Sequence, residues 1–476
     1  MASLLGIDIG TSGTKVMLLD EKTGVAGIES ETYQVSIPRL GYAEQNPDVW
    51  WEAVLCCLSR LREKYGKCYS EVAGIGFSGQ MHGLVMVDAD GRPIRPAILW
   101  LDQRSTKECN ELNERIPEDL ITGSLRNRIF TGFALPSLLW VKKHEPELFA
   151  RIRKIMLPKD YLVYCLTGVH ATDYSDASGM LLLDVEHKCW SRDMLALCGI
   201  SESQMPRLYE SFAPVGTLLP ETAAALGLPQ GVTVCAGAGD NAAAAVGTGT
   251  VSTGAAHADS RCNISLGTSG TIFISSEKFG VDATNGLHAF AHADGGWHLM
   301  GCMLSAASCN KWWQDAIIGT NDYKGEEAKI APEMLGRNHV YFLPYLMGER
   351  SPINDTNARA MFVGMTMDTA RADMTQALLE GVAFAIRDSF EVAKGLGLSI
   401  PRSNICGGGS RSMLWKRILA NVLGIPLDVV KTSEGPGYGA ALLAMVACGE
   451  YGTVAQACSA LVRTVDTVEP DASLTA

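Results

Sequence analysis

Residues 8–14 read Asp-Ile-Gly-Thr-Ser-Gly-Thr, and residues 265–271 read Ser-Leu-Gly-Thr-Ser-Gly-Thr. Each copy lies between two apolar runs that are typical of β-strands, with a glycine turn joining them. One strand–turn–strand unit that occurs twice, far apart in the chain, indicates an internal repeat. We therefore expect a duplicated fold, with one copy of the unit in each half.

Around the repeat, short β-branched runs alternate with helical patterns, which favours an α/β architecture. Strands are expected at residues 4–9, 16–19, 72–77 and 232–236, and helices at 47–65, 105–115, 305–315 and 437–448. No low-complexity linker separates the halves. We place an N-terminal domain at 1–244 and a C-terminal domain at 245–476, with a hinge near 243–262.

The composition is that of an ordinary globular protein. Hydrophobic residues make up 47% of the 476 and charged residues 19%, which excludes a disordered chain. Forty basic and 52 acidic residues give a net charge of −12. The chain is therefore a poor candidate for a general nucleic-acid binder, because phosphate contacts need a basic face.

The cysteine spacing and the lengths of the apolar runs indicate the cellular compartment. The 14 cysteines form no C-x-x-C pair and no zinc-spaced cluster, so we expect reduced thiols. The sequence contains no run of about 20 apolar residues, so we expect no membrane span. The first residues also lack the basic region of a signal peptide. We expect a cytoplasmic protein with no membrane or nucleic-acid partner.

The two glycine turns are candidate phosphate-binding loops. Backbone N–H groups and hydroxyls that small residues expose form nests for phosphate oxygens. The candidate residues are Gly10, Thr11 and Ser12 in the first turn and Gly267 and Thr268 in the second. No Walker A loop is present, and no G-x-G-x-x-G follows the first strand. A plain hairpin turn is the alternative for either one alone.

Asp8 ends the first predicted strand, beside the first turn. A carboxylate there is a candidate Mg²⁺ ligand, directly or through water, because Mg²⁺ is held by few carboxylates and by substrate phosphates. The second copy has Ser265 at the matching position. One acid in two copies is expected if only one half holds the metal. A carboxylate that caps the hairpin is the alternative.

Asp240 follows a buried apolar strand and a Gly-Ala-Gly turn. Phosphoryl transfer to an alcohol needs a carboxylate that orients the hydroxyl and accepts its proton. Asp240 is our candidate for this base, and the neighbouring small residues leave room for a substrate. The alternative is an N-cap for the helical segment at 241–246.

A third glycine cluster, Gly407, Gly408 and Gly409, joins a short strand to a helix. A planar base can lie against such exposed backbone, and the positive end of the helix favours anions. Tight packing between the helix and the strand is the alternative explanation.

Two further strand ends carry polar side chains. The segment 79–83, Gly-Gln-Met-His-Gly, places Met81 and His82 between two glycines. Planar polar groups beside an apolar wall suit sugar hydroxyls, so this is our candidate sugar site; a structural histidine is the alternative. The segment 100–104 has a similar composition, with Trp100 and Asp102 as candidates and an ordinary surface ion pair as the alternative.

Together these motifs resemble the FGGY carbohydrate kinases of the sugar kinase/actin/Hsp70 superfamily. The likeness runs from residue 6 to about 448 and includes two signature stretches, at 133–140 and 360–380. The resemblance implies two duplicated actin-like, ribonuclease H-like ATPase domains around a central cleft. It also implies a sugar bound deep against the first domain, with ATP and Mg²⁺ as cofactors.

Within that family, Met81-His82 is similar to the members that phosphorylate xylulose, where glycerol kinases carry Arg-Glu. This implies ATP-dependent phosphorylation of D-xylulose to D-xylulose 5-phosphate. Asp240 would be the base, and Asp8 would assist Mg²⁺ and phosphate. Met81, His82, Asp240 and Asn241 would contact the sugar.

Three positions depart from the family pattern: Ser137 stands at a usual Lys, Leu101 at a usual Asn and Ile353 at a usual His. The alternatives are a kinase for another ketose or polyol, such as ribulose, arabinitol or gluconate, and a non-catalytic sugar or nucleotide sensor. A homodimer is a further expectation.

Overall fold

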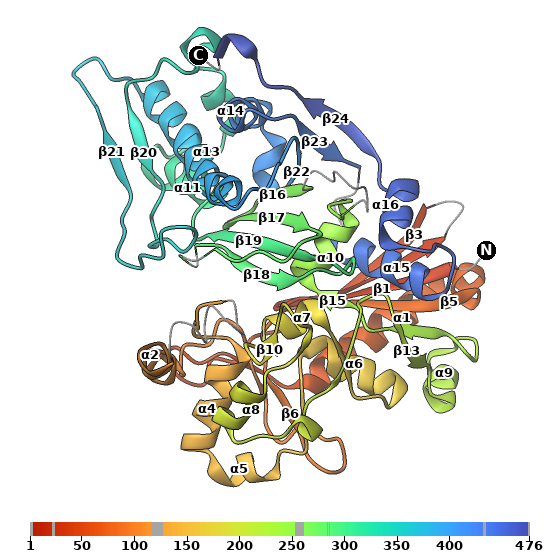
Figure 1. Cartoon of the computed structure of the whole chain (residues 1–476). Helices are drawn as coiled ribbons and strands as arrows, with labels where there is room; N and C mark the ends of the chain where they lie inside the picture. The colour runs from red at the N-terminus through yellow and green to blue at the C-terminus, as the bar shows by residue number, and fades with distance from the viewer. Residues whose placement is uncertain are drawn as a thin grey trace. The chain divides into compact units, whose positions relative to one another are not determined.

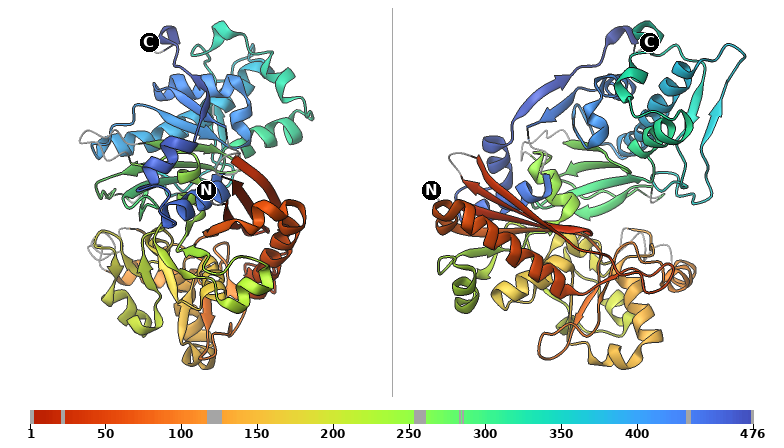
Figure 2. Two further views of the ribbon diagram at one scale, coloured as in Figure 1. Left: turned by 90° about the vertical axis from the view of Figure 1, so that its right-hand side faces the viewer. Right: turned by 180° about the vertical axis from the view of Figure 1, so that it is seen from behind.

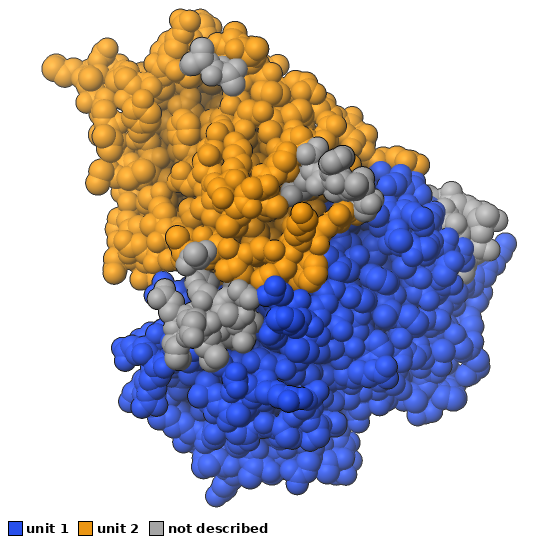
Figure 3. All heavy atoms as spheres, in the orientation of Figure 1, with its two compact units in different colours: residues 1–251, 290–296, 434–462 blue, residues 252–289, 297–433, 463–476 orange. Residues whose placement is uncertain are grey.

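The computed structural model describes residues 3–20, 24–116, 127–252, 261–282, 284, 286–431 and 435–474. The chain forms two compact units (Figure 3). The first contains residues 1–251, 290–296 and 434–462, and the second contains 252–289, 297–433 and 463–476. The predicted boundary at 244/245 stays a prediction. Residues 253–260 of the expected hinge lie outside the described residues.

The first unit is built on a seven-stranded sheet. Its strands are β1 (Ser3–Ile9), β2 (Gly13–Asp20), β3 (Gly24–Thr32), β5 (Val72–Gly79), β13 (Pro214–Thr217), β14 (Thr233–Cys235) and β15 (Ala238–Gly239). Six follow in the order β13-β14-β5-β1-β2-β3, and β15 also pairs with β5. β1 to β3 form an antiparallel meander, whereas β5 runs parallel to β1, β14 and β15. The strands expected at 4–9, 72–77 and 232–236 are confirmed.

The two faces of this sheet pack against different elements. Successive side chains of β1 point to opposite faces. Leu5 and Ile7 join an apolar core with Trp50 of α1 (Pro47–Ser70). Gly6 and Asp8 face the other way, toward α15 (Gly435–Ala447). The long α1 and the sheet are seen from behind in Figure 2. Asp8 thus lies on the face opposite this apolar core.

Glycines let α15 approach the sheet and α10 (Asp240–Gly247) at backbone distance. A Cβ added at Gly6 would lie 2.0 Å from a carbonyl oxygen of α15. A Cβ at Gly439 would lie 1.9 Å from the Ala243 carbonyl oxygen, and one at Gly247 would lie 2.0 Å from the Gly435 carbonyl oxygen. No real Cβ fits at such distances, so these contacts fix how α10 packs on α15.

The rest of the first unit consists of short elements around the sheet (Figure 1). They are β4 (Glu44–Gln45), β6 (Val85–Val87), β7 (Ala97–Ile98), α2 (Thr106–Arg115), α4 (Ala134–His144), α5 (Pro146–Arg151), β8 (Lys154–Met156), α6 (Pro158–Thr167), β9 (Ala171–Asp173), α7 (Tyr174–Ser178), β10 (Leu183–Asp184), β11 (Cys189–Trp190), α8 (Arg192–Cys198), β12 (Arg207–Tyr209), α9 (Pro220–Leu226) and α16 (Val454–Leu461).

The second unit repeats the strand arrangement of the first. Its sheet contains β16 (Cys262–Leu266), β17 (Gly270–Ser276), β18 (His288–Ala291), β19 (Trp297–Met303), β22 (Ser403–Cys406), β23 (Leu427–Val430) and β24 (Thr464–Val468), in the order β18-β19-β17-β16-β22-β23-β24. The run β22-β16-β17-β19 matches β5-β1-β2-β3, with one parallel pair followed by an antiparallel meander. The predicted α/β fold with two related halves is confirmed.

Helices and one hairpin complete the second unit. They are α11 (Ala307–Trp312), a π-turn (Trp313–Ile317), α12 (Tyr323–Glu327), β20 (Tyr341–Leu343), β21 (Met361–Val363), α13 (Arg371–Gly395) and α14 (Met413–Leu423). The apolar core of this unit packs α13 and α14 against the sheet. Phe390 of α13 and Trp415 of α14 belong to this core.

Three element predictions need correction. The helix expected at 47–65 continues to Ser70, because the chain passes through one non-helical residue, Tyr65, and resumes its helix. The helix expected at 305–315 begins at Ala307 and continues as the π-turn. The helix expected at 437–448 belongs to the first unit, although it follows the second half in sequence. Within the described residues, no helix is long and apolar enough to cross a membrane.

Replacing Gly439 with Ala should destabilise the protein. Alanine favours a helix interior by about 1 kcal/mol over glycine, but here its Cβ would collide with the Ala243 carbonyl oxygen. We expect a net loss of about 2 kcal/mol or more in the free energy of unfolding, measured in urea. Gly66 in α1 is the control, since a Cβ there meets nothing within 4 Å. Equal stability of G439A and G66A would contradict the packing described.

Candidate active site

Asp8 is held in β1 by the strand beside it. It pairs in register with Lys15 of β2 and Ser78 of β5. The Ser78 hydroxyl donates a hydrogen bond to Asp8 Oδ1 over 2.8 Å. Asp8 is the next-to-last residue of its strand, so its carboxylate lies close to the first glycine turn.

Asp240 is the first residue of α10 and comes directly after β15. Its Oδ1 accepts a hydrogen bond from the Asn241 N–H over 2.7 Å. Gly239, just before it, lies against Met81, because a Cβ at 239 would be 2.9 Å from Met81 Cγ. The alternative of Asp240 as an N-cap does not hold, since the N-cap position is Gly239.

The surroundings of Asp240 disfavour its negative charge. Burial, and then the charge of Asp8, raise the pKa of Asp240 from 3.8 to about 7, against the lowering effect of the Asn241 N–H. The effect of Asp8 means that the two carboxylates are close enough to interact. A carboxylate with a pKa near neutrality is well matched to accept a proton from an alcohol.

The arrangement of carboxylates fits Mg²⁺ that arrives with a nucleotide. Among the described residues, no group of three or more His, Cys, Asp or Glu side chains could hold a metal ion. Mg²⁺ needs only one or two carboxylates when phosphates and water complete its octahedron. Asp8, the predicted ligand, would be such a carboxylate.

Met81 and His82 stand on a constrained loop after β5. His82 has a φ of +70°, which is uncommon for a residue other than glycine. Its Nδ1 lies 2.8 Å from the Gly179 carbonyl oxygen, and its ring stacks on Phe133 with centroids 4.0 Å apart. Asn241 Nδ2 lies 3.8 Å from Met81 Sδ. The structure therefore brings Met81, His82 and Asn241 together beside Asp240.

The carbonyl acceptor at Nδ1 defines the tautomer of His82. A carbonyl oxygen can only accept, so Nδ1 carries the proton and a neutral ring has its lone pair on Nε2. The φ value and the aromatic stack hold the ring in this orientation.

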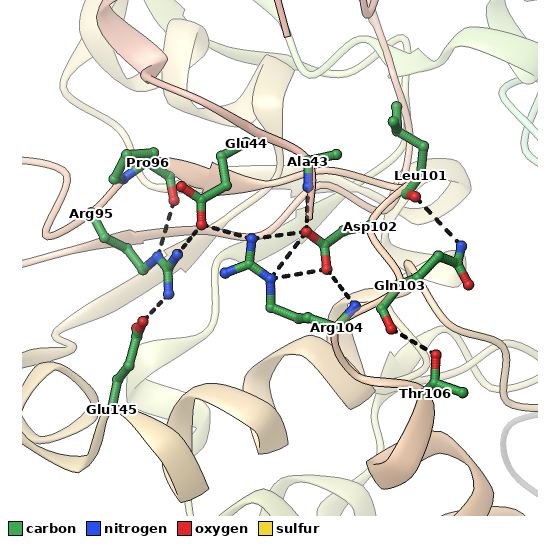
Figure 4. A network of polar contacts seen from close by, with 10 residues as sticks. All are labelled: Ala43, Glu44, Arg95, Pro96, Leu101, Asp102, Gln103, Arg104, Thr106 and Glu145. Atoms are coloured by element: carbon green, nitrogen blue, oxygen red, sulfur yellow. Dashed lines mark hydrogen bonds and ion pairs between the residues drawn. The ribbon is translucent and has the colours of Figure 1, made fainter. Parts of the chain in front are cut away.

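Trp100 and Asp102 have different surroundings. Trp100 is 46% exposed, and its Nε1 donates to Thr11 Oγ1 over 2.9 Å, next to the first turn. Asp102 is buried and accepts from the Ala43 N–H at 2.6 Å and from Arg104 Nη2 at 2.8 Å (Figure 4). Arg104 also pairs with Glu44 at 2.6 Å. Asp102 thus forms a buried ion pair, not the surface ion pair of the alternative, and its contact with a substrate stays a prediction.

The first glycine turn is a hairpin with a fixed shape. The Gly10 N–H donates to the Gly13 carbonyl oxygen over 2.9 Å, and the Tyr33 hydroxyl donates to the Gly10 carbonyl over 2.8 Å. Gln45 Nε2 donates to the Thr11 carbonyl over 2.7 Å. These three hydrogen bonds hold the turn through its carbonyl oxygens. None of the three involves the N–H group of Thr11 or of Ser12.

The second turn and the third glycine cluster meet in the second unit. Gly407 has a φ of +87°, and a Cβ there would lie 2.6 Å from the carbonyl oxygen of Leu266, the residue before Gly267. The Gly267 and Thr268 carbonyls accept from N–H groups at the start of α11. A Cβ at Gly408 would meet nothing within 4 Å. The predicted connection from a strand to a helix is confirmed, and a 3₁₀ turn over Gly408–Arg411 leads from β22 into α14.

Several residues of this site were not predicted from the sequence. The Ser78 hydroxyl donates a hydrogen bond to Asp8, and the Phe133 ring stacks on His82. A group of buried charged side chains around Lys159 lies against Gly79, the last residue of β5. The dense polar run at 172–178 within an apolar stretch was the available signal for the last group. Of the three departures from the family pattern, Ser137 is buried in α4 and Ile353 is 44% exposed.

Comparisons with known proteins agree on one family. The N-terminal domain model of the FGGY family of carbohydrate kinases matches residues 3–247, and its C-terminal domain model matches 262–448. The xylulose kinase of Escherichia coli is 42% identical over 446 residues, or 93% of this chain and 90% of that protein.

Two solved structures are similar over nearly the whole chain. A Brucella ovis protein described as a "xyloylose kinase" has a TM-score of 0.92 at 40% identity, covering 99% of this chain and 95% of that one. A gluconate kinase from Lactobacillus acidophilus has a TM-score of 0.91 at 24% identity, covering 99% and 94%. The second likeness shows the fold alone.

Replacing Asp240 with Asn should stabilise the folded protein above pH 7. A folded-state pKa near 7, above the unfolded value of 3.8, means that ionising Asp240 between those pH values costs the folded state free energy. Asn keeps the shape without the charge. We expect the D240N variant to gain roughly 1–3 kcal/mol over wild type at pH 8, and the gain to vanish near pH 4. Thermal unfolding at both pH values measures this, and a gain of equal size at both would refute it.

Proposed function

Because the chain belongs to the FGGY family of carbohydrate kinases, we propose that it transfers the γ-phosphoryl group of ATP to O5 of D-xylulose. The products are D-xylulose 5-phosphate and ADP. The observation that supports D-xylulose as the substrate is the 42% identity, over 93% of the chain, with a xylulose kinase. The arrangement of Asp8, Asp240, Met81 and His82 in the first unit supports the chemistry.

Asp240 is the proposed general base. As the O5–Pγ bond forms, the bond from Pγ to the bridging oxygen of ADP breaks, and the O5 proton passes to the Asp240 carboxylate. The Asn241 N–H keeps one oxygen oriented, over 2.7 Å. The raised pKa of Asp240 supports this role, because a carboxylate with an ordinary pKa would accept the proton less readily.

Asp8 is the proposed link to Mg²⁺ and phosphate. Mg²⁺, when bound, would neutralise charge on the β- and γ-phosphates. Asp8 would hold it through water, with the Ser78 hydrogen bond fixing the carboxylate. Asp8 also disfavours charge on Asp240, so each carboxylate influences the other.

The sugar is proposed to bind on the loop after β5. Met81 would form an apolar wall, and His82 and Asn241 would contact sugar hydroxyls. Trp100 would line the opening beside Thr11. Asp102, whose oxygens accept from Ala43 and Arg104, would hold the segment that carries Trp100 at the edge of the sugar site.

The glycine turns are proposed as nucleotide-binding loops. Gly10, Thr11 and Ser12 would offer N–H groups and hydroxyls to phosphate oxygens, and so would Gly267 and Thr268. The cluster Gly407, Gly408 and Gly409 would lie against adenosine. The open space beside Gly408 supports this, since a flat base needs backbone without a side chain.

Turnover of D-xylulose that depends on Asp240 is the test of this function. ADP release with Mg²⁺-ATP should be fastest for D-xylulose in a panel with D-ribulose, L-ribulose, L-xylulose, D-arabinitol, gluconate, glycerol and no sugar. In D240A, kcat should fall by about 10²–10⁴-fold, with ATP binding nearly intact. D315N, a surface carboxylate paired with Lys311, is the control and should keep its kcat within about twofold.

The outcomes separate the alternatives. Preference for another sugar would keep the kinase and overturn the substrate. No turnover with any sugar, while ATP still binds, would favour a sensor. Near-normal turnover in D240A would overturn the base.

We also propose a cytoplasmic homodimer. All 14 cysteines are thiols, and the proposed reaction consumes ATP, both of which suit the cytoplasm. In the hairpin of β20 and β21, Tyr341 opposes Val363 and Leu343 opposes Met361, and all four side chains are exposed. Phe342, between them, is buried toward α13. An apolar outer face of this kind suits a second copy of the chain.

Replacing Met361, which is 55% exposed, with Lys should break such a dimer. A lysine in an apolar interface would be desolvated without a partner. Light scattering after gel filtration should give a dimer for wild type and a monomer for M361K. V465K, at another exposed apolar position of the second unit, is the control. A wild-type monomer, or a dimer in M361K, would contradict this interface.

A further inference from the structure

A group of charged side chains is buried behind the proposed sugar site. Lys159, at the start of α6, is fully buried, with its Nζ 2.7 Å from Asp160 Oδ1 and 2.8 Å from Asp173 Oδ1. Asp176 Oδ2 is 3.6 Å from the same Nζ. A Cβ at Gly79, the last residue of β5, would lie 2.9 Å from Lys159 Cβ. The proposed reaction uses none of these groups directly.

Such a group is costly unless its members satisfy one another. A buried ion without a partner costs several kcal/mol, so Lys159 and its carboxylates stabilise each other only in one geometry. Burial raises the pKa of Asp160 and of Asp176, in spite of the lowering effect of Lys159. Lys159 therefore holds Asp160 and Asp173 by direct contact. Asp176, at 3.6 Å, accepts no hydrogen bond from any described residue with either oxygen.

Asp173 connects this group to Ser175. Its Oδ1 contacts Lys159, while its Oδ2 accepts from the Ser175 N–H at 2.8 Å, the Ser175 hydroxyl at 2.5 Å and the Ser211 hydroxyl at 2.7 Å. The Ser175 hydroxyl has its proton directed to Asp173. Its lone pairs are thereby left to accept a hydrogen bond from another group.

That other group is the backbone beside the proposed base. The Gly239 N–H donates to Ser175 Oγ over 3.2 Å. Gly239 is the N-cap of α10 and has no side chain to cap the helix itself. On its other side it lies against Met81. The position of the Asp240 backbone is thus fixed between Ser175 and the loop that carries Met81.

We propose that Ser175 is a positioning residue for phosphoryl transfer, held by Asp173 and Lys159, and that it fixes the backbone from which Asp240 reaches the substrate hydroxyl. This inference rests on the proposed role of Asp240 as the base. A hydroxyl behind the base can matter because a misplacement of about 1 Å at a reacting group costs as much as 10²-fold in rate.

The chain offers a closely matched control in Ser178. Both serines lie in α7 and are buried. The Ser178 hydroxyl donates to the Tyr174 carbonyl and accepts from the Ala291 N–H over 3.0 Å. Ser→Ala at either position therefore removes one hydroxyl and deprives one buried N–H of its acceptor. The two variants differ in which N–H is affected.

We expect S175A to lose at least tenfold in kcat, with KM for D-xylulose and for Mg²⁺-ATP within about threefold of wild type. S178A should keep kcat within about twofold while losing similar thermal stability. Amide exchange in the peptide that contains Gly239, followed by mass spectrometry, should accelerate in S175A only. S175T, which keeps the hydroxyl, should retain kcat within about fivefold of wild type.

Equal kcat in S175A and S178A, or a loss in S175T as large as in S175A, would overturn the positioning role. The D240A variant distinguishes the two levels of the proposal. If D240A is inactive and S175A is normal, the positioning role fails and the base stands. If D240A is fully active, both fail.

Discussion

Contacts of glycine with backbone carbonyls, between β1, α15 and α10, determine where the proposed base stands. Gly6 brings α15 onto the sheet, and Gly439 and Gly247 bring α10 onto α15, each at a distance that no side chain permits. The first residue of α10 is Asp240. The same face of β1 carries Asp8. The packing of β1, α15 and α10 through small residues therefore positions both Asp8 and Asp240.

The charge of Asp8 beside the half-buried Asp240 costs folding free energy and suits the proposed proton transfer. Burial and Asp8 together raise the pKa of Asp240 to about 7. The folded protein has less stability above neutral pH than an uncharged side chain at 240 would give it. The second set of buried acids behaves differently, because Lys159 compensates Asp160 and Asp173 directly. In that set Lys159 is the counter-ion, whereas burial and the like charge of Asp8 raise the pKa of Asp240.

Much of this could be predicted from the sequence, because repeats and glycine turns are local patterns. The paired Gly-Thr-Ser-Gly-Thr turns predicted two related sheets, and the strand ends predicted the places of Asp8 and Asp240. Long-range packing was not predictable in the same way. Nothing in the sequence near α15 shows that it returns to the first unit. The contacts of Ser175 with Asp173 and Gly239 join distant segments, and no spacing reveals them.

The most direct test of the central claim is a ¹³C NMR titration of the Asp240 carboxyl in the nucleotide-free protein. Aspartate carboxyl carbons would be labelled, and the Asp240 signal would be identified by its absence in D240N. The account predicts a titration midpoint at about pH 7. A midpoint near the ordinary value of about 4 would mean that the carboxyl is solvated and distant from Asp8, and it would contradict the account.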